Sequence, residues 1–247
     1  MIVQIQRIHR DVSPDYGSPR VHRELQACGV CGCLNTVAKV MSDAGLRART
    51  RRKYRVVTTD SKHHLPIAPN LLQQDFQADR LDAIWLTDIT YVATREGFTY
   101  LCTVEDLCSR RIVGWATSRT MTAQLTLAAL QQAIDLRAPS PGLIVHSDRG
   151  SQFASLEYQQ RLADHGVRQS MSGRGNCYDN APMESFFRSY KVEEVSWAKY
   201  ETHEQATRGV IEYIDRFYNR VRRHSSLGYV SPIAFEQSRL FESKQVG

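Results

Sequence analysis

Three strand-like segments in succession, followed by alternating helices and strands, are the feature that most constrains the fold of this chain. The segments 83–92, 98–105 and 111–117 are rich in Ile, Val, Thr, Tyr and Trp, which favour strands. Beyond them the pattern alternates, with a helix from Thr122 to about residue 139, a strand at 143–145, a helix from Ser155 to Gly166, a strand at 167–170, and helices at 181–195 and 202–219. This order predicts an α/β fold, a mixed sheet flanked by helices.

The first 57 residues differ from the rest in charge. They contain 11 Lys and Arg against 4 Asp and Glu, whereas the other 190 residues contain 21 against 22. Two short helices are predicted here, one opening at Ser18-Pro19 and one carrying Leu34, Val37 and Met41 and ending at Gly45. With the basic run behind them, they suit a small all-α helix-turn-helix domain that binds DNA. A helical hairpin that only packs, with a solvated basic face, is the alternative.

These patterns divide the chain into four parts. Residues 1–57 form the basic helix-turn-helix region, and residues 58–75, with Pro66 and Pro69 and little periodicity, form a linker. Residues 76–240 form the core and residues 241–247 a tail.

Several classes of protein are disfavoured. No segment has the ~18 consecutive apolar residues of a membrane span, and the first residues lack the features of a signal peptide. Six cysteines in 247 residues do not make a disulfide framework, so we expect a reduced, cytoplasmic setting. Cys28, Cys31 and Cys33, with His22 upstream, suggest zinc but lack four regularly spaced ligands, which favours small buried side chains instead.

Three acidic residues lie where their neighbours would normally exclude a charge. Asp88 is on an otherwise apolar strand face, Asp148 ends a short apolar strand, and Glu184 is early in a helix. Singly, each has an ordinary interpretation as an ion pair, a turn residue or a first-turn charge. Together, such hard oxygen donors favour Mg²⁺ or Mn²⁺ over zinc. Two ions held in this way suit in-line displacement at a phosphodiester.

Two basic residues share a helix face with Glu184. Arg188 and Lys191 follow it by four and seven residues, about one and two turns. Lys191 could hold a DNA phosphate beside the metals, or it could form an intrahelical ion pair, and the spacing does not choose between them.

Longer motifs around these residues resemble a known family. Asp148 and Glu184 have 35 residues between them, as in the Asp-Asp-35-Glu signature of retroviral integrases and related bacterial transposases. The motifs at 85–91, 146–153 and 175–187 are similar to those of insertion-sequence transposases of the OrfB class. The stretch 16–46 resembles the helix-turn-helix of that class, and Asn219, Arg222 or Arg223, His224, Leu227 and Ser231-Pro232 resemble its C-terminal signature.

The resemblance implies a ribonuclease-H-like integrase catalytic core. In such a core Asp88, Asp148 and Glu184 would be the catalytic residues and the ligands of two Mg²⁺ or Mn²⁺ ions. It implies a DNA transposase that cleaves strands at element ends and joins the freed 3′-hydroxyl to another phosphodiester, without a covalent protein–DNA intermediate. The residues expected to contact DNA are basic ones from all parts of the chain: Lys191, Arg188, Arg149, Arg51, Arg52, Lys53, Arg222, Arg223 and His224.

Partners and alternatives follow from the same resemblance. Expected partners are double-stranded DNA, further copies of this chain assembled on it, and the product of the element's first reading frame, with no membrane. The expected location is the bacterial cytoplasm, at the nucleoid. The main alternative is a catalytically incomplete DNA-binding partner or inhibitor that requires fusion with the first-frame product. A metal-dependent nuclease that cuts without joining, or a tyrosine recombinase using Arg220 to His224, are further alternatives.

Overall fold

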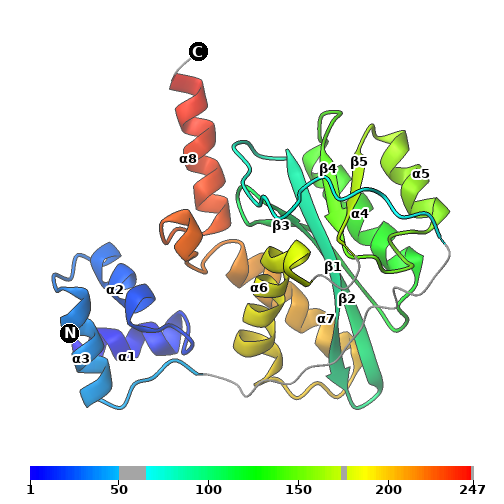
Figure 1. Ribbon diagram of the computed structural model, residues 1–247. Coiled ribbons are helices and arrows are strands. Elements are labelled where there is room, and N and C mark those ends of the chain that lie inside the picture. The colour runs from blue at the N-terminus through cyan, green and yellow to red at the C-terminus, as the bar shows by residue number, and fades with distance from the viewer. Residues whose placement is uncertain (50–64, 174–176, 246–247) are drawn as a thin grey trace.

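The centre of the molecule is a five-stranded mixed sheet, seen in a computed structural model that describes residues 1–49, 65–173 and 177–245 (Figure 1). The order is β3-β2-β1-β4-β5. Its strands are β1 (Ile84–Thr94), β2 (Gly97–Asp106), β3 (Ile112–Ser118), β4 (Ile144–Ser147) and β5 (Arg168–Met171). Strand β1 pairs antiparallel with β2 and parallel with β4, so it joins the hairpin half of the sheet to the parallel half. The predicted α/β fold is confirmed.

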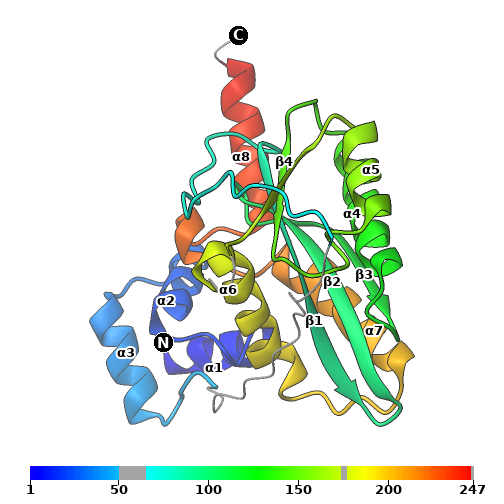
Figure 2. The same ribbon diagram turned by 45° about the vertical axis from the view of Figure 1, so that its right-hand side comes forward.

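Helices cover both faces of the sheet (Figures 1 and 2). On one face lie α4 (Ala123–Arg137) and α5 (Leu156–Asp164), and on the other lie α6 (Ala181–Tyr190) and α7 (His203–Ile211). Because side chains alternate along β1, Trp85 and Ile89 enter the core under α4 and α5. Leu86 and Val92 enter the core under α6 and α7. Gly114 lets α4 approach β3, since a Cβ there would lie 2.3 Å from the Ala129 carbonyl oxygen.

The N-terminal region is a three-helix unit, which we call the head (residues 1–49). It comprises α1 (Ile2–Asp11), α2 (Ser18–Ala27) and α3 (Leu34–Asp43) around a core of Ile5, Ile8, Tyr16, Val21, Leu25, Val37 and Met41. Helices α2 and α3 match the two predicted from the sequence, and the chain turns after α3 at Gly45. Helix α1 was not predicted, although Ile5 and Ile8 recur at helical spacing and are buried.

Several helices extend beyond their α-helical parts. Helix α6 continues as a π-helical stretch, Lys191–Val195, and α7 continues as another, Glu212–Tyr218. Helix α8 (Pro232–Gln245) crosses the boundary predicted at residue 240 and projects from the body (Figure 2). Short 3₁₀ turns precede α6 (Cys177–Asn180) and follow α7 (Ser225–Leu227). Within the described residues, no helix combines the length and the apolar character that crossing a membrane requires.

The described part of the predicted linker packs against the core. Leu72 is buried in the cluster under α6 and α7, and the Leu71 backbone N–H donates to Ser170 Oγ at 2.9 Å. Residues 50–64, which include the rest of the linker and the basic residues Arg51, Arg52 and Lys53, lie outside the described residues.

Candidate active site

The pairing of β1 with β4 brings two of the three acidic residues side by side. Leu86 of β1 is in register with His146 of the parallel strand β4. Asp88 and Asp148 each lie two residues beyond that pair, so they are level with each other, Asp88 on β1 and Asp148 directly after β4. Adjacent strands are about 4.8 Å apart. The two aspartates, 60 positions apart in the sequence, therefore line one cavity.

The turn after β4 holds Asp148 in place. Its Oδ1 accepts a hydrogen bond from the Gly150 backbone N–H at 2.9 Å. A Cβ at Gly150 would lie 3.0 Å from both Asp148 Oδ1 and Gln152 Oε1, so this turn has little room for a side chain. Gln152 and Met121 also line the cavity, and Gln152 Nε2 donates to the Met121 carbonyl at 3.0 Å. The sequence did not single out Met121, which lies far from the acidic motifs.

Asp88 is in an environment that opposes its negative charge. The side chain is half-buried, and its Oδ1 accepts from the Ile89 backbone N–H at 2.7 Å. Burial raises the pKa of Asp88 well above its usual range, and the nearby Asp148 carboxylate raises it further. Glu184 acts in the same direction, whereas Lys191 partly offsets the effect. Asp148, Glu184 and Lys191 are therefore all close enough to act on the charge of Asp88.

Glu184 and Lys191 approach this site from α6. Glu184 lies in the exposed first turn of the helix, and Lys191 starts the π-helical stretch at its end. The Lys191 ammonium lies 4.9 Å from the centre of the Tyr91 ring on β1, in cation–π geometry. Arg188 is exposed between them on the same helix. Helix α6 and its π-helical continuation thus place one acid and one cation near β1.

The three acids do not all line the same cavity in this structure. Glu184 does not line the cavity shared by Asp88 and Asp148. Among the residues that the structure describes, no group of three or more His, Cys, Asp or Glu side chains is arranged to hold a metal ion. The same search covers His22 and the three cysteines near it. Cys28, Cys31 and Cys33 are exposed, not buried as expected.

Three residues predicted to contact DNA are bound within the chain, where the core meets the head: Arg223 joins the two, whereas Arg222 and His224 are held by residues of the core. Arg222 is buried and forms two hydrogen bonds to the Glu193 carboxylate, both 2.7 Å. Arg223 binds Glu24 of α2 at 2.6 and 3.0 Å, and burial with the neighbouring arginines lowers the pKa of His224 to about 2. DNA contact by Arg222, Arg223 and His224 stays a prediction, and it would require these internal contacts to open.

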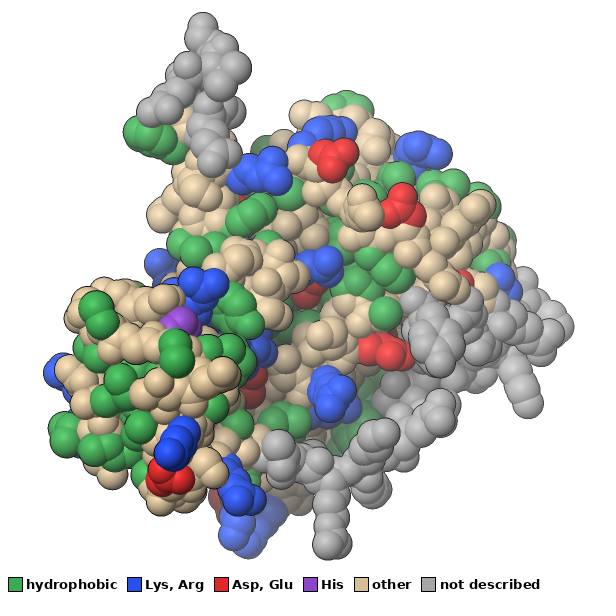
Figure 3. Space-filling model, turned by 60° about the vertical axis from the view of Figure 1, so that its left-hand side comes forward, with side chains coloured by type: hydrophobic (Ala, Val, Ile, Leu, Met, Phe, Trp, Pro, Cys, Tyr) green, Lys and Arg blue, Asp and Glu red, His purple; other side chains and the backbone are tan. Residues whose placement is uncertain are grey.

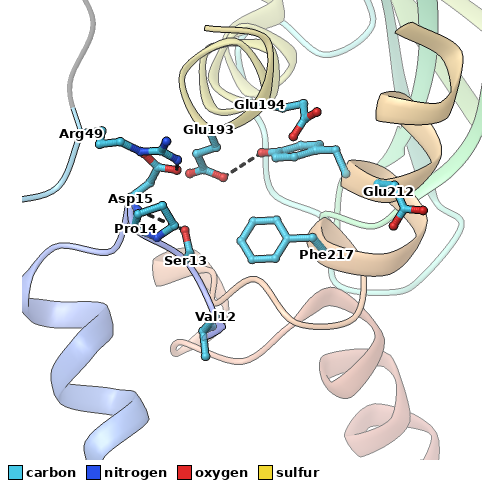
Figure 4. Close-up of a pocket in the computed structure, with 10 residues that line it drawn as sticks. Val12, Ser13, Pro14, Asp15, Arg49, Glu193, Glu194, Glu212 and Phe217 are labelled. Carbon is cyan, nitrogen blue, oxygen red and sulfur yellow. Dashed lines mark hydrogen bonds and ion pairs between the residues drawn. The ribbon is translucent and has the colours of Figure 1, made fainter. Parts of the chain in front are cut away.

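Further ion pairs complete this contact region, which we call the seam. Arg20 of α2 lies 3.6 Å from Glu193, and Arg49 binds Asp15 at 2.7 Å while stacking on the Trp197 ring. A cleft of about 240 Å³ lies beside these pairs, with Glu193, Glu194 and Glu212 in its wall (Figure 4). Figure 3 shows basic and acidic side chains along the hollow between head and core.

Arg149 is also engaged within the chain. Its Nε donates to the Ser172 carbonyl at 2.6 Å, which ties the turn after β4 to the end of β5. Its predicted DNA contact, like those of Arg188 and Lys191, stays a prediction.

Models of known protein families match most of the chain. Two models described as Integrase core domain match residues 78–177 and 165–232, and one described as HTH-like domain matches residues 1–54. Among curated proteins, the chain is 46% identical over 225 residues to the transposase InsF for insertion sequence IS3A of Escherichia coli (strain K12), covering 91% of this chain and 78% of that protein. It is 42% identical over 235 residues to an uncharacterized 31 kDa protein of insertion element IS600 from Shigella sonnei, covering 95% of this chain and 86% of that protein.

Comparison with solved structures matches, among others, two viral integrase cores. One is the HTLV-2 integrase catalytic core domain in complex with magnesium, with a TM-score of 0.47, 16% identity, and coverage of 64% of this chain and 99% of that one. The other is the catalytic core domain of BIV integrase, with a TM-score of 0.48, 17% identity, and coverage of 66% and 99%.

Proposed function

This chain belongs to the family of insertion-element transposases with an integrase core domain, and from that membership we propose that Asp88, Asp148 and Glu184 are its catalytic residues. As a member of the family, it is a DNA transposase, a polynucleotidyl transferase of the DDE type. The observation that carries the residue assignment is that the parallel pairing of β1 and β4 places Asp88 and Asp148 side by side, where both line one cavity. Glu184 is included because its charge acts on Asp88 from the facing helix.

We propose Mg²⁺ or Mn²⁺ as the cofactor of this site, with two ions per site. Carboxylate oxygens are the donors that these ions prefer. Asp88 and Asp148 repel each other across the cavity, and a divalent cation between them would remove that repulsion. When bound, the ions would activate the attacking hydroxyl and stabilise the leaving oxygen of an in-line displacement. Glu184 would complete the ligand set by moving closer to the two aspartates.

The chain's own cations would hold the DNA. Lys191 lies beside the acidic group and can neutralise a phosphate next to the bond that breaks. Arg188, exposed one turn away, can contact a second phosphate of the same strand. The head, with its helix-turn-helix-like fold, would contribute further contacts to double-stranded DNA. Two element ends must be held together in one reaction, so we propose assembly of several copies on DNA, with the first-frame product as a further partner.

Cleavage and joining assays test this assignment. The full chain is incubated with labelled element-end DNA and Mn²⁺, with and without the first-frame product. Asp148→Asn and Glu184→Gln should each reduce both cleavage and strand transfer by more than about 100-fold, because even outer-shell partners of a metal are worth 10–100-fold. DNA affinity, measured by gel shift in the same buffer, should stay within about threefold of wild type.

The controls separate the alternatives. Asp164→Asn removes a charge of the same sign from an exposed side chain on α5 and should leave both reactions unchanged. Wild-type-like joining by Glu184→Gln or Asp148→Asn would refute the assignment. Cleavage without any joining by the wild-type chain would identify a nuclease instead.

A further inference from the structure

Asp179 is a buried carboxylate outside the acidic group described above. It lies in the 3₁₀ turn before α6, five residues ahead of Glu184, and its side chain is 2% exposed. Its Oδ2 accepts from the Gly173 backbone N–H at 2.6 Å and from Asn70 Nδ2 at 3.0 Å. Its Oδ1 accepts from Gln74 Nε2 at 3.0 Å. One carboxylate therefore binds donors from two segments, one more than 100 positions away and one directly before the turn.

The first of these segments is held in the conformation that the contact needs. Asn70 Oδ1 accepts from the backbone N–H groups of Leu72 and Gln73, which fixes a turn. Gln73 and Gln74 both have positive φ, 50° and 67°, a conformation that side-chain-bearing residues rarely adopt. Such strain persists only where surrounding contacts hold it. The Gln74 hydrogen bond to Asp179 is one of those contacts.

The second segment leads directly from the sheet to α6. Gly173 follows β5, so its bond to Asp179 closes the connection between β5 and the start of α6. The side chain of His146, two residues before Asp148, also lies near Asp179, whose backbone and charge raise the pKa of the imidazole against the effect of burial. His146 is buried and bonds through Nδ1 to Ser170 Oγ at 2.8 Å. Asp179 thus links the strand that carries Asp148 with the helix that carries Glu184.

We propose that Asp179 is a positioning residue that fixes the start of α6, and with it the distance of Glu184 from Asp88 and Asp148. This rests on the proposed function, in which these three acids hold the metal ions. The segment 70–74 is the partner that makes the fixation rigid, because it binds both oxygens of the same carboxylate, Asn70 at Oδ2 and Gln74 at Oδ1. Asp179 itself does not line the cavity that Asp88 and Asp148 share.

Gln74→Glu tests the proposal without touching an acid of the site. The change places a second carboxylate against Asp179 Oδ1, where Gln74 now donates. Repulsion should displace the start of α6, lower the cleavage rate by roughly 10–100-fold, and raise the Mn²⁺ concentration for half-maximal cleavage by a similar factor. Binding of element-end DNA should be unchanged. Gln77→Glu, at an exposed residue just outside the segment 70–74, is the matched control and should behave as wild type.

A double variant distinguishes positioning from a general loss of stability. In Asp179→Asn with Gln74→Glu, the new amide donates to the new carboxylate, while the remaining oxygen still accepts from Asn70 and Gly173. The hydrogen-bond geometry is restored although the charge has moved. Cleavage and its Mn²⁺ dependence should return to within about threefold of wild type. Failure of this rescue, in a variant with normal thermal unfolding, would overturn the positioning role.

The remaining outcomes also decide the question. Wild-type cleavage and Mn²⁺ dependence in Gln74→Glu would overturn the proposal, whereas an active Glu184→Gln measured in parallel would instead overturn the proposed function. If Gln74→Glu does not fold, Gln74→Ala removes the same single hydrogen bond from an exposed side chain. It should raise the half-maximal Mn²⁺ concentration about threefold, and an unchanged value would overturn the proposal.

Discussion

The acidic cavity and the seam both gather charged side chains, but they balance them in opposite ways. At the cavity, Asp88 and Asp148 face each other and the charge of Glu184 adds to their repulsion. At the seam, by contrast, Arg222 and Arg223 are each bound by both oxygens of a glutamate. Like charges are left close together in the first region, and opposite charges are paired in the second.

The difference distinguishes a ligand-binding site from a structural contact between the head and the core. Buried like charges cost free energy unless a ligand of opposite charge arrives, so the cavity is suited to bind cations. A paired and hydrogen-bonded seam has little to gain from a new ligand, but it loses much when one partner is removed. The three predictions below test this contrast, beginning with the seam, where the expected change in stability is largest.

Removing Glu193 should be the most damaging single change. Glu193 accepts both hydrogen bonds from buried Arg222 and one from the Tyr213 hydroxyl at 2.8 Å. Glu193→Ala leaves the Arg222 charge buried without its partner, which typically costs about 3–5 kcal/mol. Urea unfolding of the full chain measures this loss. Arg208→Ala, which breaks the exposed pair with Glu204, is the control and should cost less than about 1 kcal/mol. A similar small cost for Glu193→Ala would remove the contrast.

Glu105 is a buried carboxylate with a raised pKa, as at the cavity, and it has an arginine partner, as at the seam. It should therefore make the stability of the fold depend on pH. Its side chain is buried on β2, and burial raises its pKa to about 8 although Arg110 lies 3.4 Å away. Folding therefore takes up a proton between about pH 4.5, its ordinary pKa, and pH 8. The free energy of unfolding should fall as pH rises through this window, by at most about 1.4 kcal/mol per pH unit.

Glu105→Gln should remove that contribution. The variant should gain stability relative to wild type as pH rises from 5 to 8, measured by urea unfolding at several pH values. A difference between the two proteins that stays constant with pH would show that Glu105 does not take up the proton.

Asp88→Asn should have the smallest effect on stability and the opposite sign from Glu193→Ala. The change removes a carboxylate that is repelled by Asp148, so the metal-free chain should gain about 1 kcal/mol, or 2–4 °C in melting temperature. The raised pKa of Asp88 means that this gain should grow with rising pH and disappear in acid.

Added Mn²⁺ should reverse the order of the two proteins. It stabilises wild type by binding only the folded chain, and it should stabilise Asp88→Asn much less. Thermal unfolding with and without Mn²⁺ makes the measurement. Equal stabilisation of both proteins by Mn²⁺ would place the cation elsewhere.

The sequence predicts the core well because its signals there are local. The strand-forming runs predicted at 83–92, 98–105 and 111–117 and the cap at Ser155 each depend on neighbouring residues, and the structure has strands at 84–94, 97–106 and 112–118 and a helix after Ser155. The position of Asp148 at a strand end also follows from a local pattern. Helix α8 and the π-helical stretches were not predicted, since their form depends on packing with distant elements.

The seam shows why other features could not be predicted. Arg223 pairs with Glu24, 199 positions away, and Arg222 pairs with Glu193 on another helix. A cluster of arginines near the C-terminus suggests a DNA surface when only its neighbours are considered. Within the fold, these arginines are bound by glutamates that are distant in sequence, one on another helix of the core and one in the head. The same holds for Asp179, whose partners Asn70 and Gln74 lie more than 100 positions away.

The register between β1 and β4 restricts how this chain can change in length. Side chains alternate between the two faces of a sheet, so a one-residue insertion between Ile84 and Asp88, or between Ile144 and Asp148, would turn one aspartate away from the other. Insertions at surface turns, such as the tip between β1 and β2, would leave that alignment unchanged. Two stretches of five residues must therefore keep their length during evolution, while much of the surface around them is free to grow or shrink.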